Sequence, residues 1–352
     1  MNTLPIYPLL ALVGQTEMKT ALVLALINPA IGGVLLSGPY GVGKTTAVRG
    51  LLDLMPPVER SICDQGCLPG DGEEPCADCQ ERLARGEPIT RMDVMRLIEL
   101  PLNARLEDVI GGINERVALE QQRVLLEEGI LARAHSNLLY VDEINLLDPA
   151  VVDAILDAAA QGRTFVRRGP LIRLYPSRFV LVGSMNPEEG ELRPQILDRL
   201  GLRVWVAPLC SSEERLEVYR RAATFRRDPI ALRASYADQT ARLREEIVQA
   251  RQLLPQVILQ PAAEELAITV IQELGIPSHR AEIVTLEAAR ARAAADGRSQ
   301  ATPADVAAVA PLALRWRRRA HLEAAAAATE AEDRAIREAL ERHGIDLPAG
   351  GW

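Results

Sequence analysis

Residues 38–45 form the first pattern in this chain that could do chemistry. They run Gly-Pro-Tyr-Gly-Val-Gly-Lys-Thr, which matches the G-x-x-x-x-G-K-[ST] spacing of a phosphate-binding loop. The glycines let the backbone turn its N–H groups toward an anion. Lys44 would reach the β- and γ-phosphates, and the Thr45 hydroxyl would bind Mg²⁺. We therefore expect a magnesium nucleotide to lie along the whole loop: Gly38, Pro39, Tyr40, Gly41, Val42, Gly43, Lys44, Thr45 and Thr46.

Two adjacent acids, Asp142 and Glu143, follow an apolar run that begins at residue 137. Nucleotide hydrolysis needs one carboxylate to hold the Mg²⁺ shell and another to polarise the attacking water. We assign the first role to Asp142 and the second to Glu143. Their position about 100 residues after the phosphate loop makes this pair a stronger signal than an acidic strand end alone.

Two further polar residues follow later elements. Asn186 comes directly after the apolar run 179–184, where its amide could orient the attacking water, although Asn-Pro also begins turns. Arg199 lies far along the chain from the phosphate loop and follows an acid. That position suits an arginine that acts on the nucleotide of a neighbouring subunit.

Four of the five cysteines fall within residues 56–90, a segment rich in proline, glycine and acids. Cys63, Cys67, Cys76 and Cys79 have the spacing C-x3-C-x8-C-x2-C, which lets four thiolates close on Zn²⁺. Such a site would be structural, because four thiolates leave no open position. The alternative is a surface insertion with incidental thiols. We expect Cys210 to be a buried small apolar residue.

The elements that must position these residues follow from apolar patterning. We expect strands at about 34–36, 95–101, 137–141, 179–184 and 202–206, and a hairpin over 164–174. Helices are expected over 17–27 (amphipathic), 113–131, 192–200, 213–253 (a pair broken at Pro229), 262–274, 280–296, 303–318 and 322–343. We expect the basic run around Trp316, with Arg315 and Arg317 to Arg319, to lie on a solvated helix face.

Composition limits the class of protein. The 352 residues have room for about two domains. A net charge of −8 and an isoelectric point near 5.3 argue against nucleic acid as a partner. The sequence has no apolar run of about 20 residues and no pattern of a signal peptide, so we expect a cytoplasmic protein without a membrane anchor.

Together, these motifs resemble an AAA+ ATPase. Val13-Gly14-Gln15, the phosphate loop as Walker A, Asp142-Glu143 as Walker B, Asn186 as sensor 1 and Arg199 as arginine finger all match that class. The runs 31–36, 138–147 and 183–195 more closely resemble the ATPase subunit I of magnesium chelatase, and the similarity covers about residues 8–320. Val13-Gly14-Gln15 is typical of an adenine contact, or of a tight turn before a helix.

The resemblance implies an α/β fold: an AAA+ P-loop core with a parallel sheet flanked by helices, and an all-α lid. It implies a core at 1–210, a helical linker at 211–254, and a lid with a C-terminal helix at 255–352. The core would carry the cysteine-containing insertion at about 56–90, a helix-2 insertion at about 103–122 and the hairpin 164–174. Arg280 occupies the position of a sensor-2 arginine in the lid.

In function, the resemblance implies ATP and Mg²⁺ as cofactors and a homo-oligomeric ring, usually a hexamer. The partners would be a second AAA+-like subunit with an integrin-type domain and a large porphyrin-binding subunit. Together they insert Mg²⁺ into protoporphyrin IX on the route to chlorophyll or bacteriochlorophyll. The sequence GPYGVGKT and the alanine-rich tail depart from the family pattern. The alternatives are a MoxR-type or cobalt-chelatase-like remodelling ATPase with another client, or a nucleotide-gated scaffold with little hydrolysis.

Overall fold

The computed structural model describes residues 5–63, 66–69, 74–113, 120, 126–168, 171–317 and 325–344. The chain forms two compact units. Unit 1 comprises Met1–Met55, Val141–Leu146 and Val182–Trp352, and unit 2 comprises Pro56–Tyr140 and Leu147–Leu181. Unit 1 is therefore assembled from segments far apart in the sequence. The predicted division into core, linker and lid by chain position stays a prediction.

The α/β class is confirmed by one five-stranded sheet with the strand order β11-β1-β10-β7-β4. Strand β1 pairs in parallel with β10 on one side and with β11 on the other. All residues of β1 and β10 are buried, as expected for strands covered on both faces. The strands of this sheet are β1 (Val34–Ser37), β4 (Leu97–Leu100), β7 (Leu138–Val141), β10 (Val180–Met185) and β11 (Leu202–Trp205).

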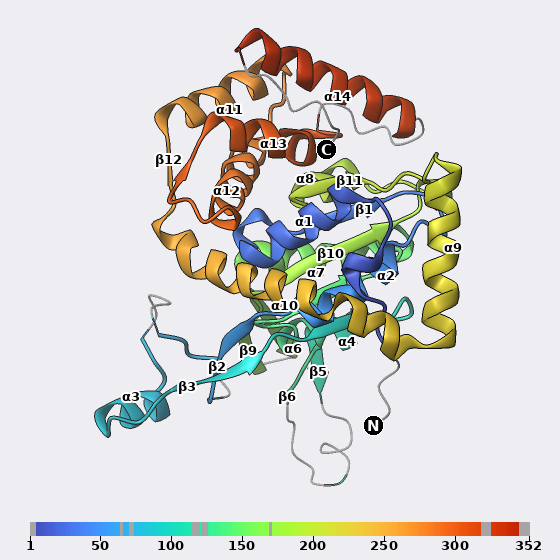
Figure 1. Cartoon of the computed structure of the whole chain (residues 1–352). Coiled ribbons are helices and arrows are strands. Elements are labelled where there is room, and N and C mark those ends of the chain that lie inside the picture. The colour runs from blue at the N-terminus through green and yellow to red at the C-terminus, as the bar shows by residue number, and fades with distance from the viewer. Residues whose placement is uncertain are drawn as a thin grey trace. The chain divides into compact units, whose positions relative to one another are not determined.

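The remainder of unit 1 is mainly helical (Figure 1). Its helices are α1 (Thr16–Ile27), α2 (Lys44–Gly50), α8 (Pro194–Arg199), α9 (Ser212–Arg227), α10 (Pro229–Leu253), α11 (Pro261–Glu273), α12 (His279–Ala295), α13 (Pro303–Leu314) and α14 (Ala325–Arg342). Two short strands, β12 (Ile258–Leu259) and β13 (Gln300–Ala301), pair in parallel. The predicted helices of this region are present, including the break at Pro229, where Asp228 caps α10 through its side chain, but the helix predicted over 303–318 ends at Leu314.

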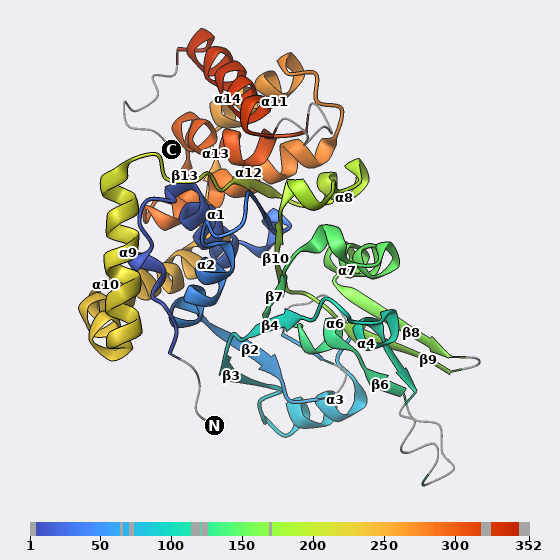
Figure 2. The same cartoon turned by 90° about the vertical axis from the view of Figure 1, so that its right-hand side faces the viewer.

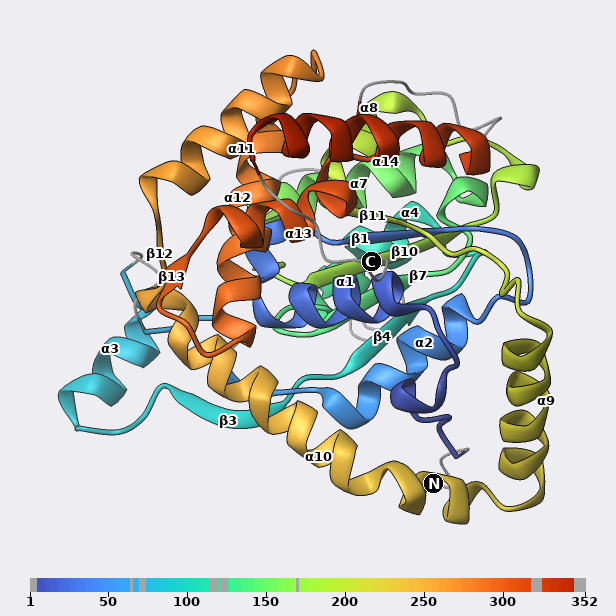
Figure 3. The same ribbon diagram turned by 45° about the horizontal axis from the view of Figure 1, so that its top comes forward.

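Helices α11 to α14 form one group, with α13 packed on both α11 and α12 (Figure 2). Helix α14 lies across α11 and α13 (Figure 3). Alanines dominate the buried positions of α12, which allows its neighbours to approach closely. Helix α13 begins with a capping box, in which Thr302 and Asp305 exchange hydrogen bonds between side chain and backbone.

In the described part of unit 2, three pairs of strands are antiparallel. The pairs are β2 with β3, β5 with β6, and β8 with β9, the last being the predicted hairpin. The elements are β2 (Pro57–Ser61), α3 (Ala77–Ala84), β3 (Thr90–Val94), α4 (Leu106–Ile110), β5 (Gly111–Ile113), β6 (Leu126–Glu128), α6 (Ile130–Arg133), α7 (Pro149–Gln161), β8 (Arg163–Arg168) and β9 (Leu171–Pro176).

Two further helix predictions need correction. The helix predicted over 113–131 is wrong at Ile113, which lies in β5, and at residues 126–128, which form β6, whereas residues 130 and 131 begin α6. Of the residues between β5 and β6, the structure describes only Glu120, so most of that prediction and part of the helix-2 insertion lie outside the described residues. Helix α1 is present but is not amphipathic, because β1, β11, α10 and α12 all contact it. Its apolar residues are buried on more than one side.

The solvated basic face predicted around Trp316 is also wrong. Arg315 is 1% exposed, and its guanidinium donates hydrogen bonds to the carboxylates of Glu17 in α1 and Asp333 in α14, at 2.8 and 3.0 Å. The Arg317 side chain is likewise 1% exposed and pairs with Asp198 at 2.8 Å. Burial lowers the pKa of Arg315, but the two facing carboxylates outweigh it and hold the pKa above its ordinary value. Arg318 and Arg319 lie outside the described residues.

This network predicts a large loss of stability for Arg315→Met. The substitution leaves Glu17 and Asp333 partly buried without their common partner, which costs about 3 kcal/mol. At roughly 2–4 °C per kcal/mol for a unit of this size, the midpoint of thermal unfolding should fall by about 6–12 °C. Differential scanning calorimetry measures it. The matched control is Arg334→Met at an exposed position of α14, and an equal midpoint for both variants would contradict the prediction.

Candidate functional site

The phosphate loop connects β1 to α2. Its backbone passes through the left-handed region at Gly41 (φ 75°) and Gly43 (φ 95°), where glycine avoids strain. Gly38 is required for another reason. A Cβ there would lie 2.4 Å from the carbonyl oxygen of Val206, just after β11. The loop therefore fits against the sheet edge only with glycine at this position.

Lys44 begins α2, and its side chain folds back over the loop. Its ammonium group donates hydrogen bonds to the carbonyl oxygens of Gly38 at 2.5 Å and Pro39 at 3.0 Å. Burial lowers the pKa of Lys44, while the carboxylates of Asp142, Glu143 and Glu189 act in the opposite direction. The ammonium is thus held at the centre of the loop and faces three acids.

Thr45 and Asp142 lie together although 97 positions separate them in the chain. The Thr45 hydroxyl donates to Asp142 Oδ2 at 3.3 Å, and the Ser184 hydroxyl donates to Asp142 Oδ1. A hydroxyl and a carboxylate oxygen at one point are the ligands that Mg²⁺ takes in nucleotide sites. The donor set therefore fits a magnesium ion held by Thr45 and Asp142.

Glu143 has a left-handed backbone with φ of 49°, which is costly for a residue with a side chain. Its backbone N–H donates to Ser184 Oγ at 3.3 Å, so one serine anchors both acids. Burial raises the pKa of Glu143, and the charges of Glu189 and Asp142 raise it further. Raised basicity suits a carboxylate that accepts a proton from water.

The amide of Asn186 supports both interpretations from the sequence. Its Oδ1 accepts from the backbone N–H of Glu188 at 3.2 Å and so caps the turn Pro187–Glu189. Its Nδ2 is buried and has no hydrogen-bond partner among the residues that the structure describes. A buried donor without a partner costs stability, so a ligand that accepts from Asn186 Nδ2 would bind favourably.

One cavity of about 230 Å³ collects these side chains, all from unit 1. It is lined by the loop residues Tyr40 to Thr46 and by Asp142, Glu143, Ser184, Met185 and Asn186. A second cavity of about 620 Å³ adjoins the same loop and has an apolar wall that includes Leu12, Val13, Pro208 and Leu209. The two cavities are suited to the phosphates and the base of a nucleotide, respectively.

Val13-Gly14-Gln15 forms a turn and also contributes to the second cavity. Gly14 and Gln15 both have left-handed backbones, and Gln15 donates to the carbonyl oxygen of Ala207 at 2.8 Å. Gly14 is close-packed, because a Cβ there would lie 2.9 Å from Leu209. Both interpretations of this motif are therefore compatible with the structure.

Arg199 and Arg280 do not line the phosphate cavity of their own chain. Arg199 ends α8, and Arg280 lies in the first turn of α12. Asp198 connects the two elements, because it accepts from Ser278 Oγ at 2.8 Å and pairs with Arg317. Residues close to both arginines therefore share one network, because Asp198 directly precedes Arg199 and Ser278 lies two positions before Arg280.

Sequence reasoning missed Ser184 and Glu189. Ser184 orients both acids. In the sequence, the feature that could have pointed to it was its position near the end of a buried strand, two residues before Asn186. Glu189 acts electrostatically on Glu143 and on Lys44. In the sequence, the feature that could have pointed to Glu189 was its position three residues after Asn186.

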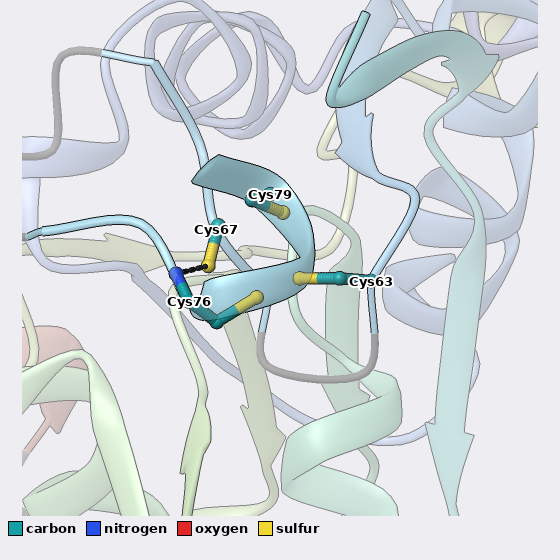
Figure 4. A group of neighbouring side chains, drawn as sticks. All are labelled: Cys63, Cys67, Cys76 and Cys79. Carbon is teal, nitrogen blue, oxygen red and sulfur yellow. Dashed lines mark hydrogen bonds between the residues drawn. The ribbon is translucent and has the colours of Figure 1, made fainter. Parts of the chain in front are cut away.

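The four clustered cysteines converge in unit 2, as Figure 4 shows. Their sulfur atoms all lie within 4.8 Å of one another. Cys210 does not behave as predicted. It is exposed, because it lies in the loop between β11 and α9 rather than beneath an element.

Comparison with known proteins gives the family. A relative from Methanocaldococcus jannaschii, named magnesium-chelatase subunit ChlI homolog, is 44% identical over 89% of this chain and 86% of its own length. The magnesium-chelatase 38 kDa subunit of Acidiphilium rubrum is 43% identical over 89% and 91%, respectively. The chain belongs to the magnesium chelatase subunit ChlI family. A family model described as magnesium chelatase, subunit ChlI, matches residues 115–209, and an AAA lid domain matches 264–339.

Membership of the ChlI family confirms the AAA+ assignment. The ChlI match contains Asp142, Glu143, Asn186 and Arg199, and the lid match contains Arg280. A crystal structure of a protein from Cytophaga hutchinsonii assigned as an ATPase aligns with a TM-score of 0.60 at 20% identity, covering 97% of this chain and 92% of that one. At that identity the likeness concerns the fold. Within the described residues, no helix has the length and apolar character needed to span a bilayer.

Proposed function

We propose that this protein is the ATP-hydrolysing motor subunit of a magnesium chelatase, which drives insertion of Mg²⁺ into protoporphyrin IX by a separate large subunit. The observation that carries the proposal is the convergence of Thr45, Asp142 and Ser184 beside the phosphate loop. The names of the relatives in the ChlI family supply the metal and the enzyme to which the motor belongs.

The residues of the cavity divide the work of hydrolysis. Lys44 neutralises the β- and γ-phosphate oxygens, and Thr45 and Asp142 hold the cation that supplies further charge stabilisation when bound. Glu143 accepts a hydrogen bond from the attacking water and takes its proton as the bond to phosphorus forms, and Asn186 Nδ2 donates to the same water or to a γ-phosphate oxygen. Water adds to the γ-phosphorus, the bond to the β-phosphate oxygen breaks, and ADP and phosphate leave.

A ring completes the site. Arg199 lies outside the cavity of its own chain, so we assign it to the nucleotide of the adjacent subunit in a homo-oligomer, which we propose is a hexamer. Arg280 belongs to the lid, from which we assign it to the γ-phosphate as sensor 2. The network through Asp198 supports a joint response of both arginines to nucleotide state.

The partners follow from the relatives, which are named as subunits. We propose a second AAA+ subunit with an integrin-type domain and a large subunit that binds the porphyrin. This chain then contributes ATP turnover, and the large subunit contributes the metal-insertion site.

The deciding experiment is reconstituted Mg²⁺ insertion into protoporphyrin IX, followed by the fluorescence of the product. The reaction should require this chain, both partner subunits and hydrolysable ATP. It should fail with a non-hydrolysable ATP analogue and with Glu143→Gln. No insertion despite robust ATPase activity and a formed ring would overturn the chelatase assignment in favour of a remodelling ATPase with another client. No ATP turnover by the assembled ring would indicate a nucleotide-gated scaffold.

A further inference from the structure

The four clustered cysteines lie outside the nucleotide site and outside both family matches, which cover residues 115–209 and 264–339. Cys63 and Cys67 lie between β2 and α3, and Cys76 and Cys79 lie at the start of α3. Figure 4 shows their sulfur atoms turned toward a common centre. The nucleotide chemistry uses none of them.

Their geometry fits a single tetrahedral ion. With Zn–S bonds of about 2.3 Å, the sulfurs of a tetrahedral site lie about 3.8 Å apart. The observed sulfurs all lie within 4.8 Å of one another, so a small contraction would complete the coordination. All four are free thiols rather than disulfides. The local pair Cys76-x-x-Cys79 comes from one helical turn, as is common in structural zinc sites.

Neighbouring polar groups already contact two of the sulfur atoms. The backbone N–H of Cys76 donates to Cys67 Sγ at 3.3 Å, a contact drawn in Figure 4. The Ser61 hydroxyl lies 3.2 Å from Cys63 Sγ and accepts from the backbone N–H of Cys63 at 3.2 Å. Such outer contacts orient metal-bound thiolates and offset part of their charge.

The described part of this segment buries little apolar surface. Among the described residues between 62 and 88, Cys79 is the only buried one, at 0% exposure. Leu83 of α3 remains 51% exposed. A segment that buries so little apolar surface cannot offset the conformational entropy lost on ordering, and small modules of this kind are held by metals or disulfides.

We propose that Cys63, Cys67, Cys76 and Cys79 bind one structural Zn²⁺ as four thiolates. The ion closes the loop between β2 and α3 and leaves no coordination position for catalysis. Zn²⁺ is favoured over hard cations because its donors here are all thiolates. This site is independent of the proposed chelatase function.

The ion also fixes a contact with the β8–β9 hairpin. Gly66, between two ligands, packs so closely on Pro176 at the end of β9 that a Cβ would lie 2.2 Å from the proline ring. A cavity of about 200 Å³ beside them is lined by Cys67 and Cys76 from the loop and by Arg163 and Leu174 from the hairpin. Zinc therefore holds the loop against the base of the hairpin.

The test begins with the metal content of the full-length protein, purified from medium containing zinc and without chelator. Elemental analysis should give about one Zn²⁺ per chain, and Cys79→Ser should lose it. Cys210→Ser is the matched control, because Cys210 is the exposed fifth cysteine, and it should keep wild-type zinc. Protein that lacks zinc and has disulfides among the four, or that contains iron with visible cluster absorption, would overturn the proposal.

A second measurement uses wild-type protein, so that misfolding of a variant cannot decide the result. In the native zinc form only Cys210 should react with a thiol reagent, and a mercurial should release zinc as the other four react. Cobalt exchanged into the site should show the bands of a four-thiolate tetrahedral complex. Hydrogen exchange at 171–176 should rise after metal removal. Five reactive thiols in the native protein before any treatment would contradict the assignment.

Discussion

Glu143→Gln should lower ATP turnover by about 10²- to 10⁴-fold, the usual effect of removing a general base. Glutamine has nearly the same shape and keeps the backbone N–H contact with Ser184 Oγ, so the site should retain its geometry. It lacks the carboxylate that polarises water. Because Lys44, Thr45 and Asp142 remain in place, Mg-ATP affinity should stay within a few-fold of wild type. Steady-state ATPase assays and equilibrium titration with a fluorescent ATP analogue measure the two quantities.

The matched control for this substitution is Glu188→Gln. Glu188 is an exposed carboxylate of the same region that contributes to the Asn186 cap through its backbone alone. Its turnover should therefore equal that of wild type. If Glu143→Gln retained more than a tenth of wild-type turnover, a different residue would have to activate the water.

Arg199→Ala should lower turnover by about 10³- to 10⁵-fold, as expected for an arginine that acts on the nucleotide of a neighbouring subunit. The side chain lies at the end of α8, outside the phosphate cavity of its own chain, so ATP binding by the free subunit should be unaffected. Arg220→Ala, which removes an exposed arginine of α9, is the control for loss of a positive charge and should remain active.

Mixing the two inactive variants tests whether Arg199 acts between subunits. In rings formed from equal amounts of Glu143→Gln and Arg199→Ala, about a quarter of the interfaces combine an intact Glu143 with an intact Arg199 from the neighbour. Turnover should therefore return well above that of either variant alone. If mixed rings of confirmed composition stayed inactive, Arg199 would have to act within its own chain or only on assembly.

Much of the fold could be predicted because its signals are local. The strand before Gly38, the strand before Asp142 and the helices after Ser211 each have a length and apolar pattern that specify one element. The helix prediction was wrong at residue 113 and at residues 126–128, where short strands β5 and β6 exist through pairing with each other. Such pairing depends on distant residues, which helix propensity does not detect.

The same distinction separates the candidate site into two parts. The spacing of Lys44 and Thr45 within one loop, and the adjacency of Asp142 and Glu143, are contained in the sequence and specify a nucleotide site. The role of Ser184 is not contained in the sequence, because a serine that orients two acids from another strand belongs to no local motif. Ser184 reaches the two acids only because the carboxyl ends of β1, β7 and β10 are neighbours in the folded sheet.

The sequence by itself determined the phosphate loop, the acidic pair, the order of most elements and the spacing of the four cysteines. Tertiary structure decided which charged side chains are buried. Arg315 and Arg317 belong to a basic run of the kind that usually faces solvent, but both are buried and pair with carboxylates on other elements. It also decided that Cys210 is exposed while the other four sulfurs converge. The physical reason is that burial and pairing depend on contacts between distant segments, whereas loop and helix patterns depend on neighbours in the chain.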